Sequence, residues 1–301
     1  MSVLVVGSIA LDSVTTPTGQ HNEMLGGSAT YFSLAASRFS PVNVVGVVGE
    51  DFPETYKNLL MKNQIDITGI QISKGKTFRW KGEYSGSMNE ARTLDTQLNV
   101  FQNFSPVIPR HYRNSKWVFL GNIHPELQLR VIEQIENAKL FALDTMNFWI
   151  DGYLQMLRKT LKHVQLLIIN ENEIRMLSGE INITRAVTSV QKMGPSTVIV
   201  KRGEYGSLMY HDKSWFYVPG YPESLVVDPT GAGDSFAGGF MGSLARSGKV
   251  TTGTLKKAMI YGSVMASFNI TSFGPWKLAE ITGSEVEQRF KLFRALVALR
   301  V

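Results

Sequence analysis

Short apolar runs alternate with longer amphipathic stretches along most of this 301-residue chain. Buried strands are expected at residues 3–6, 42–48, 117–120, 140–144, 165–169 and 197–201. Stretches with the pattern of helices lie between several of these strands, at residues 53–62, 125–136, 149–161 and 184–193. Strands that alternate with helices in this way form a parallel sheet covered by helices on both faces. We therefore predict a single α/β domain over residues 1–301.

Two segments, residues 9–25 and 65–100, interrupt this alternation. Both are rich in residues that favour strands, and polar and apolar side chains alternate in them, as in residues 77–84 (TFRWKGEY). Such alternation is typical of strands with one face exposed. The two segments therefore predict a small antiparallel sheet beside the main one.

Residues 226–240 (VVDPTGAGDSFAGGF) carry most of the functional information. An apolar pair is followed by Thr230, where a helix N-cap is expected, and then by Gly231, Ala232 and Gly233. These small residues let the backbone approach a ligand closely, and their N–H groups and the helix dipole attract an anion. Asp234 at the same helix start could take a proton from a hydroxyl while the N–H groups stabilise a transferred phosphoryl group.

The alternative is an ordinary tight loop in which Asp234 only complements the helix dipole. The nine-residue string DPTGAGDSF, however, resembles the C-terminal signature of the ribokinase-like carbohydrate kinases, also called the phosphofructokinase-B type. The resemblance covers most of the chain. It implies a three-layer αβα sandwich with a small β lid, and phosphoryl transfer from ATP to a primary hydroxyl with Asp234 as the base.

The N-terminal third contains the segments that the resemblance assigns to the acceptor. Asp12 follows the first strand, and in the family an Asp at this place binds sugar hydroxyls; a turn-capping Asp is the alternative. Gly26 and Gly27 precede a helical stretch and match the family's Gly-Gly signature. Asn147 is a further candidate for substrate binding.

The strand expected at residues 165–169 leads into Asn170 and Glu173, which fit the family's N-x-x-E motif. Spaced by three at a helix start, their oxygens lie on one face and could order the water shell of a Mg²⁺ ion that accompanies ATP. The same spacing is that of a helix capping box, which is the alternative. We expect Glu173 to act on the metal indirectly, through Mg²⁺-bound water.

The remaining ATP contacts that the resemblance implies lie in the C-terminal third. Lys201 ends a β-branched run, and Gly203 and Gly206 belong to the turn that follows it, although a simple hairpin gives the same pattern. Thr230 is placed at the phosphates, and Asn269, near the end of an apolar helix, at the adenine.

Composition agrees with a soluble enzyme. The chain is 44% hydrophobic and 19% charged, and it has no apolar stretch of membrane-spanning length, so we expect a cytoplasmic protein without a membrane partner. It has no cysteine, and its five histidines lack metal-binding spacing. The net charge of +6 is dispersed, which predicts attraction of ATP rather than nucleic-acid binding.

The acceptor is predicted to be a nucleoside. Ser28 stands where many sugar-specific relatives have Lys, whereas Phe78, Trp80 and Tyr84 in the expected lid offer aromatic surface on which a base could stack. These aromatic residues could instead pack the lid on the body or form a homodimer interface. The other readings are a kinase of ribose, fructose or inositol type, or a catalytically silent member of the fold that binds a sugar or nucleotide.

Overall fold

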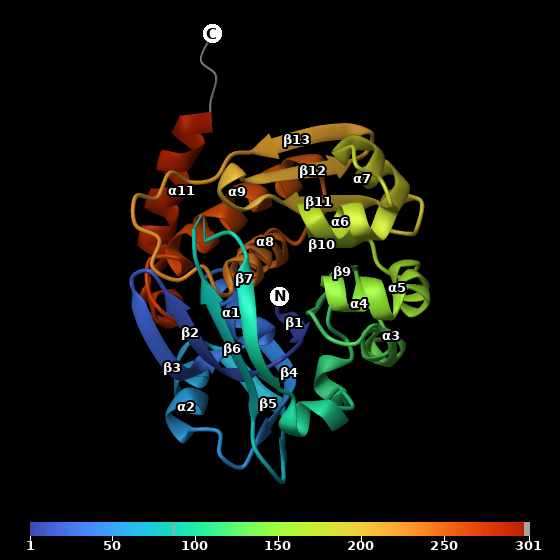
Figure 1. Ribbon diagram of the computed structural model, residues 1–301. Coiled ribbons are helices and arrows are strands. Elements are labelled where there is room, and N and C mark those ends of the chain that lie inside the picture. Colours follow the sequence, from blue (N-terminus) through green and yellow to red (C-terminus); the bar gives the residue numbers. More distant parts are fainter. Residues whose placement is uncertain (87, 298–301) are drawn as a thin grey trace.

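The computed structural model describes residues 1–86 and 88–297 and contains a nine-stranded sheet with the order β13-β12-β11-β10-β9-β8-β1-β4-β5 (Figure 1). All pairs are parallel except β11 with β12 and β12 with β13. The strands are β1 (Val3–Val6), β4 (Val42–Gly49), β5 (Ile65–Ser73), β8 (Trp117–Leu120), β9 (Leu140–Asp144), β10 (Leu166–Asn170), β11 (Thr197–Lys201), β12 (Ser207–His211) and β13 (Ser214–Val218). The mainly parallel sheet predicted from the alternation is confirmed.

Helices cover both faces of this sheet, so the central strands are apolar throughout. Successive residues of β1 and β8 enter two separate cores: Val3 and Val5 pack in one, and Leu4 and Val6 in the other. The first core is closed mainly by α1 (Ser28–Ala36), α2 (Glu54–Lys62), α8 (Ala232–Ser247), α9 (Thr252–Asn269), α10 (Trp276–Glu280) and α11 (Gly283–Val297). The second is closed by α3 (Pro125–Gln134), α4 (Asn147–Gly152), α5 (Leu154–Leu161), α6 (Glu171–Ser178) and α7 (Ile183–Gln191). The single helix expected over residues 149–161 is thus two helices, separated at Tyr153.

A second, smaller sheet has the order β3-β2-β6-β7. Its strands are β2 (Ala10–Thr16), β3 (Gly19–Gly26), β6 (Phe78–Tyr84) and β7 (Ala91–Gln97), and they appear in blue and cyan in Figure 1. The central pair β2–β6 is parallel, whereas a wholly antiparallel sheet was expected. We call this sheet the small sheet.

The expected boundary of the second lid segment, residues 65–100, is wrong at its start. β5 pairs with β4 at the edge of the large sheet and does not enter the small one. The faces of β5 are only partly covered at the end of the sheet, so polar and apolar residues alternate along it as they do in a thin sheet. The small sheet draws on this segment only from Phe78 onward.

Among residues 1–86 and 88–297, no helix is long and apolar enough to cross a membrane.

Candidate active site

A cavity of about 680 Å³ lies between the small sheet and the carboxyl ends of the large sheet's strands. It is lined from one side by β6 and β7, and from the other by residues at the ends of β9, β10 and β11 and at the start of α8. Carboxyl ends of parallel strands meet at one edge of a sheet, and ligands of open α/β folds bind there. The cavity therefore collects most of the residues that the sequence singled out.

The start of α8 has the geometry of an anion-binding turn. Gly231 is the residue before the helix and has a left-handed backbone with φ 74°, so Thr230 is not the N-cap that was expected. The N–H of Ala232 donates to the carbonyl of Pro229 at 3.1 Å. The N–H groups of Gly231 and Gly233 have no acceptor among the described residues and remain free for a ligand.

Contacts with residues outside the turn hold it in place. A Cβ atom at Gly231 would overlap the ring of Tyr31, so the glycine backbone packs closely against that ring. The carboxylate of Asp228 accepts the N–H of Thr230 at 2.9 Å and that of Gly274 at 3.1 Å. These contacts hold the turn rigid before any ligand arrives, as an electrostatically preorganised site requires.

Asp234 stands in the first turn of α8 and lines the cavity. The pKa of its carboxyl is raised to about 7, mainly by burial and also by Asp144, while Lys201 opposes the rise. A carboxyl that titrates near neutrality can accept a proton from a hydroxyl and release it again.

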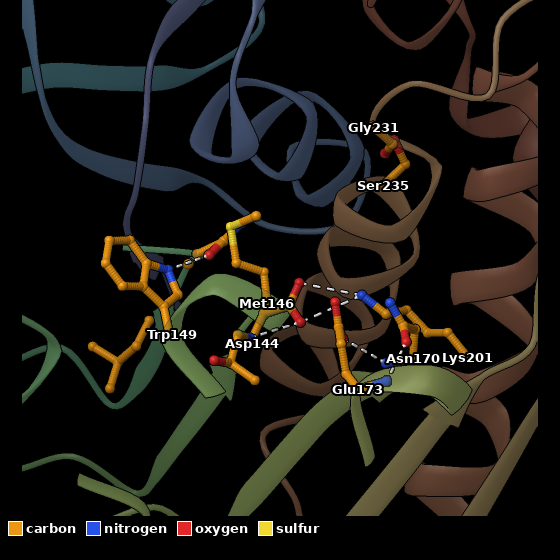
Figure 2. Close-up of polar contacts among 12 residues, drawn as sticks. Asp144, Met146, Trp149, Asn170, Glu173, Lys201, Gly231 and Ser235 are labelled. Carbon is orange, nitrogen blue, oxygen red and sulfur yellow. Dashed lines mark hydrogen bonds and ion pairs between the residues drawn. The ribbon is translucent and has the colours of Figure 1, made fainter. Parts of the chain in front are cut away.

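A charged cluster lies beside the turn, at the ends of β9, β10 and β11 (Figure 2). The ammonium of Lys201 lies 3.2 and 3.4 Å from the two carboxylate oxygens of Asp144. Burial disfavours the charge of Lys201, but Asp144, Glu173 and Asp234 together hold its pKa above the ordinary value. Asp144 was not among the predicted site residues, although its position at the last residue of an expected strand was a usable signal.

Asn170 and Glu173 form the capping box that was the alternative to a metal site. The side chain of Asn170 accepts the N–H of Glu173 at 2.7 Å, and Glu173 Oε2 accepts the N–H of Asn170 at 2.9 Å. Glu173 nevertheless lines the cavity, and burial raises its pKa to about 7, with Lys201 acting against this and Asp144 in support. Oε1 makes no hydrogen bond to the described residues and stays available.

On the acceptor side, Asp12 is only 4% exposed and lines the cavity. Its Oδ2 accepts the N–H of Gly27 at 3.3 Å, and a Cβ atom at Gly26 would overlap its carboxylate. Gly26 thus makes room for Asp12 without lining the cavity itself. Burial raises the pKa of Asp12 to about 7 against the Gly27 hydrogen bond, with Asp228 and Asp234 adding to the rise.

The three aromatic residues of β6 all line the cavity, as expected for one strand face. Trp80 lies across Gly82, and its Nε1 donates to Thr93 Oγ1 at 3.2 Å, which fixes the indole plane. Tyr84 reaches Thr230 of the anion-binding turn at 3.4 Å. Phe78 also stacks on Phe101, with 5.3 Å between ring centroids, so packing on the body accounts for part of this face.

Three predicted ATP contacts do not line the cavity: Gly203, Gly206 and Asn269. The two glycines turn the chain from β11 into β12 as a hairpin, and the side chain of Asn89 covers Gly203. Asn269 is buried and donates to the carbonyl of Thr230 at 2.7 Å, so it supports the turn from behind.

Asn147 does line the cavity, together with neighbours that were not predicted. Asn122, which follows β8, accepts the Trp149 indole N–H at 2.8 Å, and its amide nitrogen lies 3.2 Å from the sulfur of Met146. Asn122 follows β8, and Asp144 ends β9. Because ligands of open α/β folds bind at the carboxyl ends of the strands, both residues could have been predicted from their positions in the sequence.

The family profile and the similar proteins point to the same family. The profile of the pfkB family carbohydrate kinases matches residues 2–280. The chain is 28% identical over 287 residues to a cytidine kinase of Thermococcus kodakarensis, covering 92% of this chain and 99% of that protein.

Solved structures agree on the fold. The nucleoside kinase of Methanocaldococcus jannaschii, described as an archaeal member of the ribokinase family, superposes with a TM-score of 0.78 at 21% identity over 97% of this chain and 98% of that one. The Burkholderia thailandensis nucleoside kinase in complex with inosine gives a TM-score of 0.77 at 18% identity over 97% and 99%. Both show the ribokinase fold, which confirms the predicted sandwich.

Proposed function

Because this chain belongs to the pfkB family of carbohydrate kinases and is a phosphotransferase acting on a hydroxyl group, we propose that it transfers the γ-phosphoryl group of ATP to a nucleoside. The observation that carries the mechanism is the start of α8. There the Asp234 carboxyl, with a pKa near 7, stands beside the free N–H groups of Gly231 and Gly233. A base and an anion hole on one turn suit attack by an alcohol on a phosphoryl group.

In the proposed reaction, Asp12 binds hydroxyls of the acceptor's sugar and presents its primary hydroxyl to Asp234. Asp234 takes the proton as the hydroxyl oxygen forms its bond to the γ-phosphorus. The bond from that phosphorus to the bridging oxygen breaks, and ADP leaves. The N–H groups of Gly231 and Gly233 and the ammonium of Lys201 stabilise the charge on the phosphoryl oxygens during transfer.

Magnesium bound to the ATP phosphates would neutralise charge that develops on the leaving group. The residues fit an ion carried by the nucleotide better than a resident one, since the described residues hold no cluster of three metal-ligating side chains. Glu173 lines the cavity, and its Oε1, which makes no hydrogen bond to the described residues, could hold water molecules of such an ion.

The nucleoside proposal rests on the small-sheet wall of the cavity. Trp80 is held in a fixed plane by Thr93 and presents an aromatic face, as stacking on a base requires. The relative that is named a cytidine kinase covers nearly the whole chain, and cytidine is therefore the first acceptor to test.

A panel assay tests this proposal. ADP formation is followed with cytidine, adenosine, inosine, ribose, fructose, fructose phosphates and inositol at equal concentrations. We expect the highest kcat/KM for a nucleoside. A higher value for ribose, fructose or inositol would return the protein to the sugar kinases, and absence of ADP formation with every acceptor would favour a silent binding protein.

We also propose that two copies pair through their small sheets in the cytoplasm. All seven residues of β7 are exposed, which leaves this edge strand open to a partner strand. Sedimentation equilibrium at assay concentration should give twice the chain mass, and a monomer mass would contradict the pairing.

A further inference from the structure

The ammonium of Lys201 has three carboxylates around it but pairs with only one. Asp144, Glu173 and Asp234 all influence its charge. Among residues 1–86 and 88–297, the only ion pair of Lys201 is with Asp144, whose two oxygens lie 3.2 and 3.4 Å away. Figure 2 shows the side chains of Asp144 and Lys201 meeting, with Glu173 beside them.

Asp144 is itself held in place by the ends of two strands. Its Oδ1 accepts the N–H of Thr145 at 3.0 Å. Its backbone carbonyl accepts the amide of the fully buried Gln128 at 3.0 Å, and the same amide donates to Gly121, after β8, at 2.9 Å. Asp144 is therefore a fixed carboxylate rather than a mobile surface acid.

The ammonium that Asp144 holds lies against the anion-binding turn. A Cβ atom at Gly233 would come within 3.0 Å of Lys201 Nζ, so the charge is in contact with the backbone whose N–H is free. A lysine side chain has a flexible four-carbon stem and loses much conformational freedom when it is fixed. Without a partner on the far side, the ammonium would not stay at this place.

An ion pair with Asp234 or Glu173 would move the ammonium of Lys201 from its place against the anion-binding turn. An ion pair with Asp234 would stabilise the ionised form of the base and make it a poorer proton acceptor. An ion pair with Glu173 would draw the ammonium toward the helix cap.

We propose that Asp144 is a positioning residue that holds Lys201 against the anion-binding turn and away from Asp234. It acts through Lys201 and does not itself touch the transferred phosphoryl group. This inference rests on the proposed function, because the held ammonium is useful only if a phosphoryl group passes over the turn.

A double-mutant cycle in kcat tests it with Asp144→Asn, Lys201→Met and the double variant, assayed with the best acceptor of the panel. We expect Asp144→Asn to lower kcat on the order of tenfold to a hundredfold and Lys201→Met at least as much. The double variant should be no slower than Lys201→Met alone, within about twofold, because Asp144 acts through Lys201. Losses that multiply in the double variant would overturn the proposal.

ATP affinity gives a second readout that does not depend on turnover. Calorimetry with ATP and Mg²⁺ should show weaker binding for Asp144→Asn than for wild type, but no difference between the double variant and Lys201→Met. If Asp144 instead served the metal, Asp144→Asn would raise the Mg²⁺ concentration needed for binding in both backgrounds. That result contradicts the proposal.

Two controls separate positioning from folding. Glu223 and Arg289 form an ion pair at 3.3 Å with similar exposure, 17% and 21% against 7% and 19% for Asp144 and Lys201, outside the cavity. Glu223→Gln should leave kcat and ATP affinity unchanged. If Asp144→Asn melts below the assay temperature, Asp144→Ser, which keeps an oxygen near the Thr145 N–H, takes its place in the same cycle.

The panel assay separates the two claims. A wild-type protein that phosphorylates no acceptor refutes the proposed function and with it this inference. A wild-type protein that turns over while the cycle is additive refutes the inference alone.

Discussion

The two walls of the cavity are built with very different degrees of packing. On one wall, α8 is buried at eleven of its sixteen residues, and Cβ atoms at Gly238 and Gly242 would overlap backbone or side-chain atoms of α1. On the other wall, β7 is exposed at all seven residues, and β6 buries only one of its seven. Close packing fixes positions to within a fraction of an ångström, whereas a thin sheet tolerates change. The proposed base and anion hole lie on the rigid wall, and the proposed base-stacking surface lies on the thin one.

This difference makes a first prediction about the rigid wall. Asp234→Asn should lower kcat by several orders of magnitude, because it removes the proposed base while the free N–H groups of Gly231 and Gly233 remain. ATP affinity, measured by calorimetry, should change little. A variant that keeps more than about a tenth of wild-type kcat would exclude general-base catalysis by Asp234.

The same carboxyl sets a pH dependence. Burial raises the pKa of Asp234 to about 7, and only the ionised form can take a proton, so kcat/KM should fall about tenfold per unit below pH 7. Above about pH 8 Asp234 is fully ionised, so its titration should cause no further change in kcat/KM. The residual activity of Asp234→Asn should lose the part of the acid limb that Asp234 causes, whereas Asp12 and Glu173, whose pKa values are also raised to about 7, keep their own contribution.

A second prediction concerns the backbone of the rigid wall. Gly231→Ala should lower kcat about tenfold to a hundredfold, because a Cβ atom would displace the turn from the Tyr31 ring and the left-handed φ of 74° is strained for alanine. Gly179→Ala is the matched control. It has nearly the same φ, 73°, at the end of α6, with no atom within 4 Å of the added Cβ, so it should cost about 1 kcal/mol of stability and leave kcat unchanged. Equal kinetic losses in both variants would show that backbone strain alone matters.

The thin wall should respond in KM rather than kcat. Trp80→Ala should raise KM for the nucleoside about tenfold, since base stacking contributes about 1 to 3 kcal/mol, while KM for ATP stays the same. Trp215→Ala, in β13 and 39% exposed, controls for loss of a tryptophan elsewhere. An unchanged nucleoside KM in Trp80→Ala would remove the stacking argument for a nucleoside.

The smallest effect on activity is expected at Glu173, for which a role at the Mg²⁺ ion and a role as a helix cap are the two alternatives. Glu173→Gln can keep the capping box, because a glutamine oxygen also accepts the N–H of Asn170, so the melting temperature should change little. It removes the charge near the metal, so the Mg²⁺ concentration for half-maximal rate should rise a few-fold. Glu173→Ala should show both changes, with a loss of about 1 kcal/mol of stability. A Mg²⁺ requirement that is the same in all three proteins would leave Glu173 as a helix cap only.

Local patterns predicted what depends on neighbours in sequence. Six of the nine strands of the large sheet were found because both of their faces are apolar, and the turn before Asp234 because small residues precede a helix start. The contact that Asn269 makes was not predicted, for the opposite reason. Its helix was expected, but the partner of its amide, the carbonyl of Thr230, lies 39 residues away in the chain.

The sequence predicted where strands lie better than it predicted which strands pair. β2 and β3 form the hairpin that sequence neighbours often form, but β2 also pairs in parallel with β6, from a segment that begins more than sixty residues later. β5 has the alternation of the small sheet and belongs to the large one. An alternating pattern indicates that one face of a strand is buried, but it does not indicate which element covers that face.

The sequence by itself determined the family, the glycine-rich turn and the position of Asp234, because each is encoded in a contiguous run of residues. It determined the fold class through the alternation of strands and helices along the chain. Only the tertiary structure decided which side chains serve that turn. Lys201 meets Asp144 across 57 residues of chain, and the Tyr31 ring lies under Gly231 because α1 packs against α8. An ion pair or a packing contact needs two groups at a set distance, and distance between remote residues is fixed only when the core has formed.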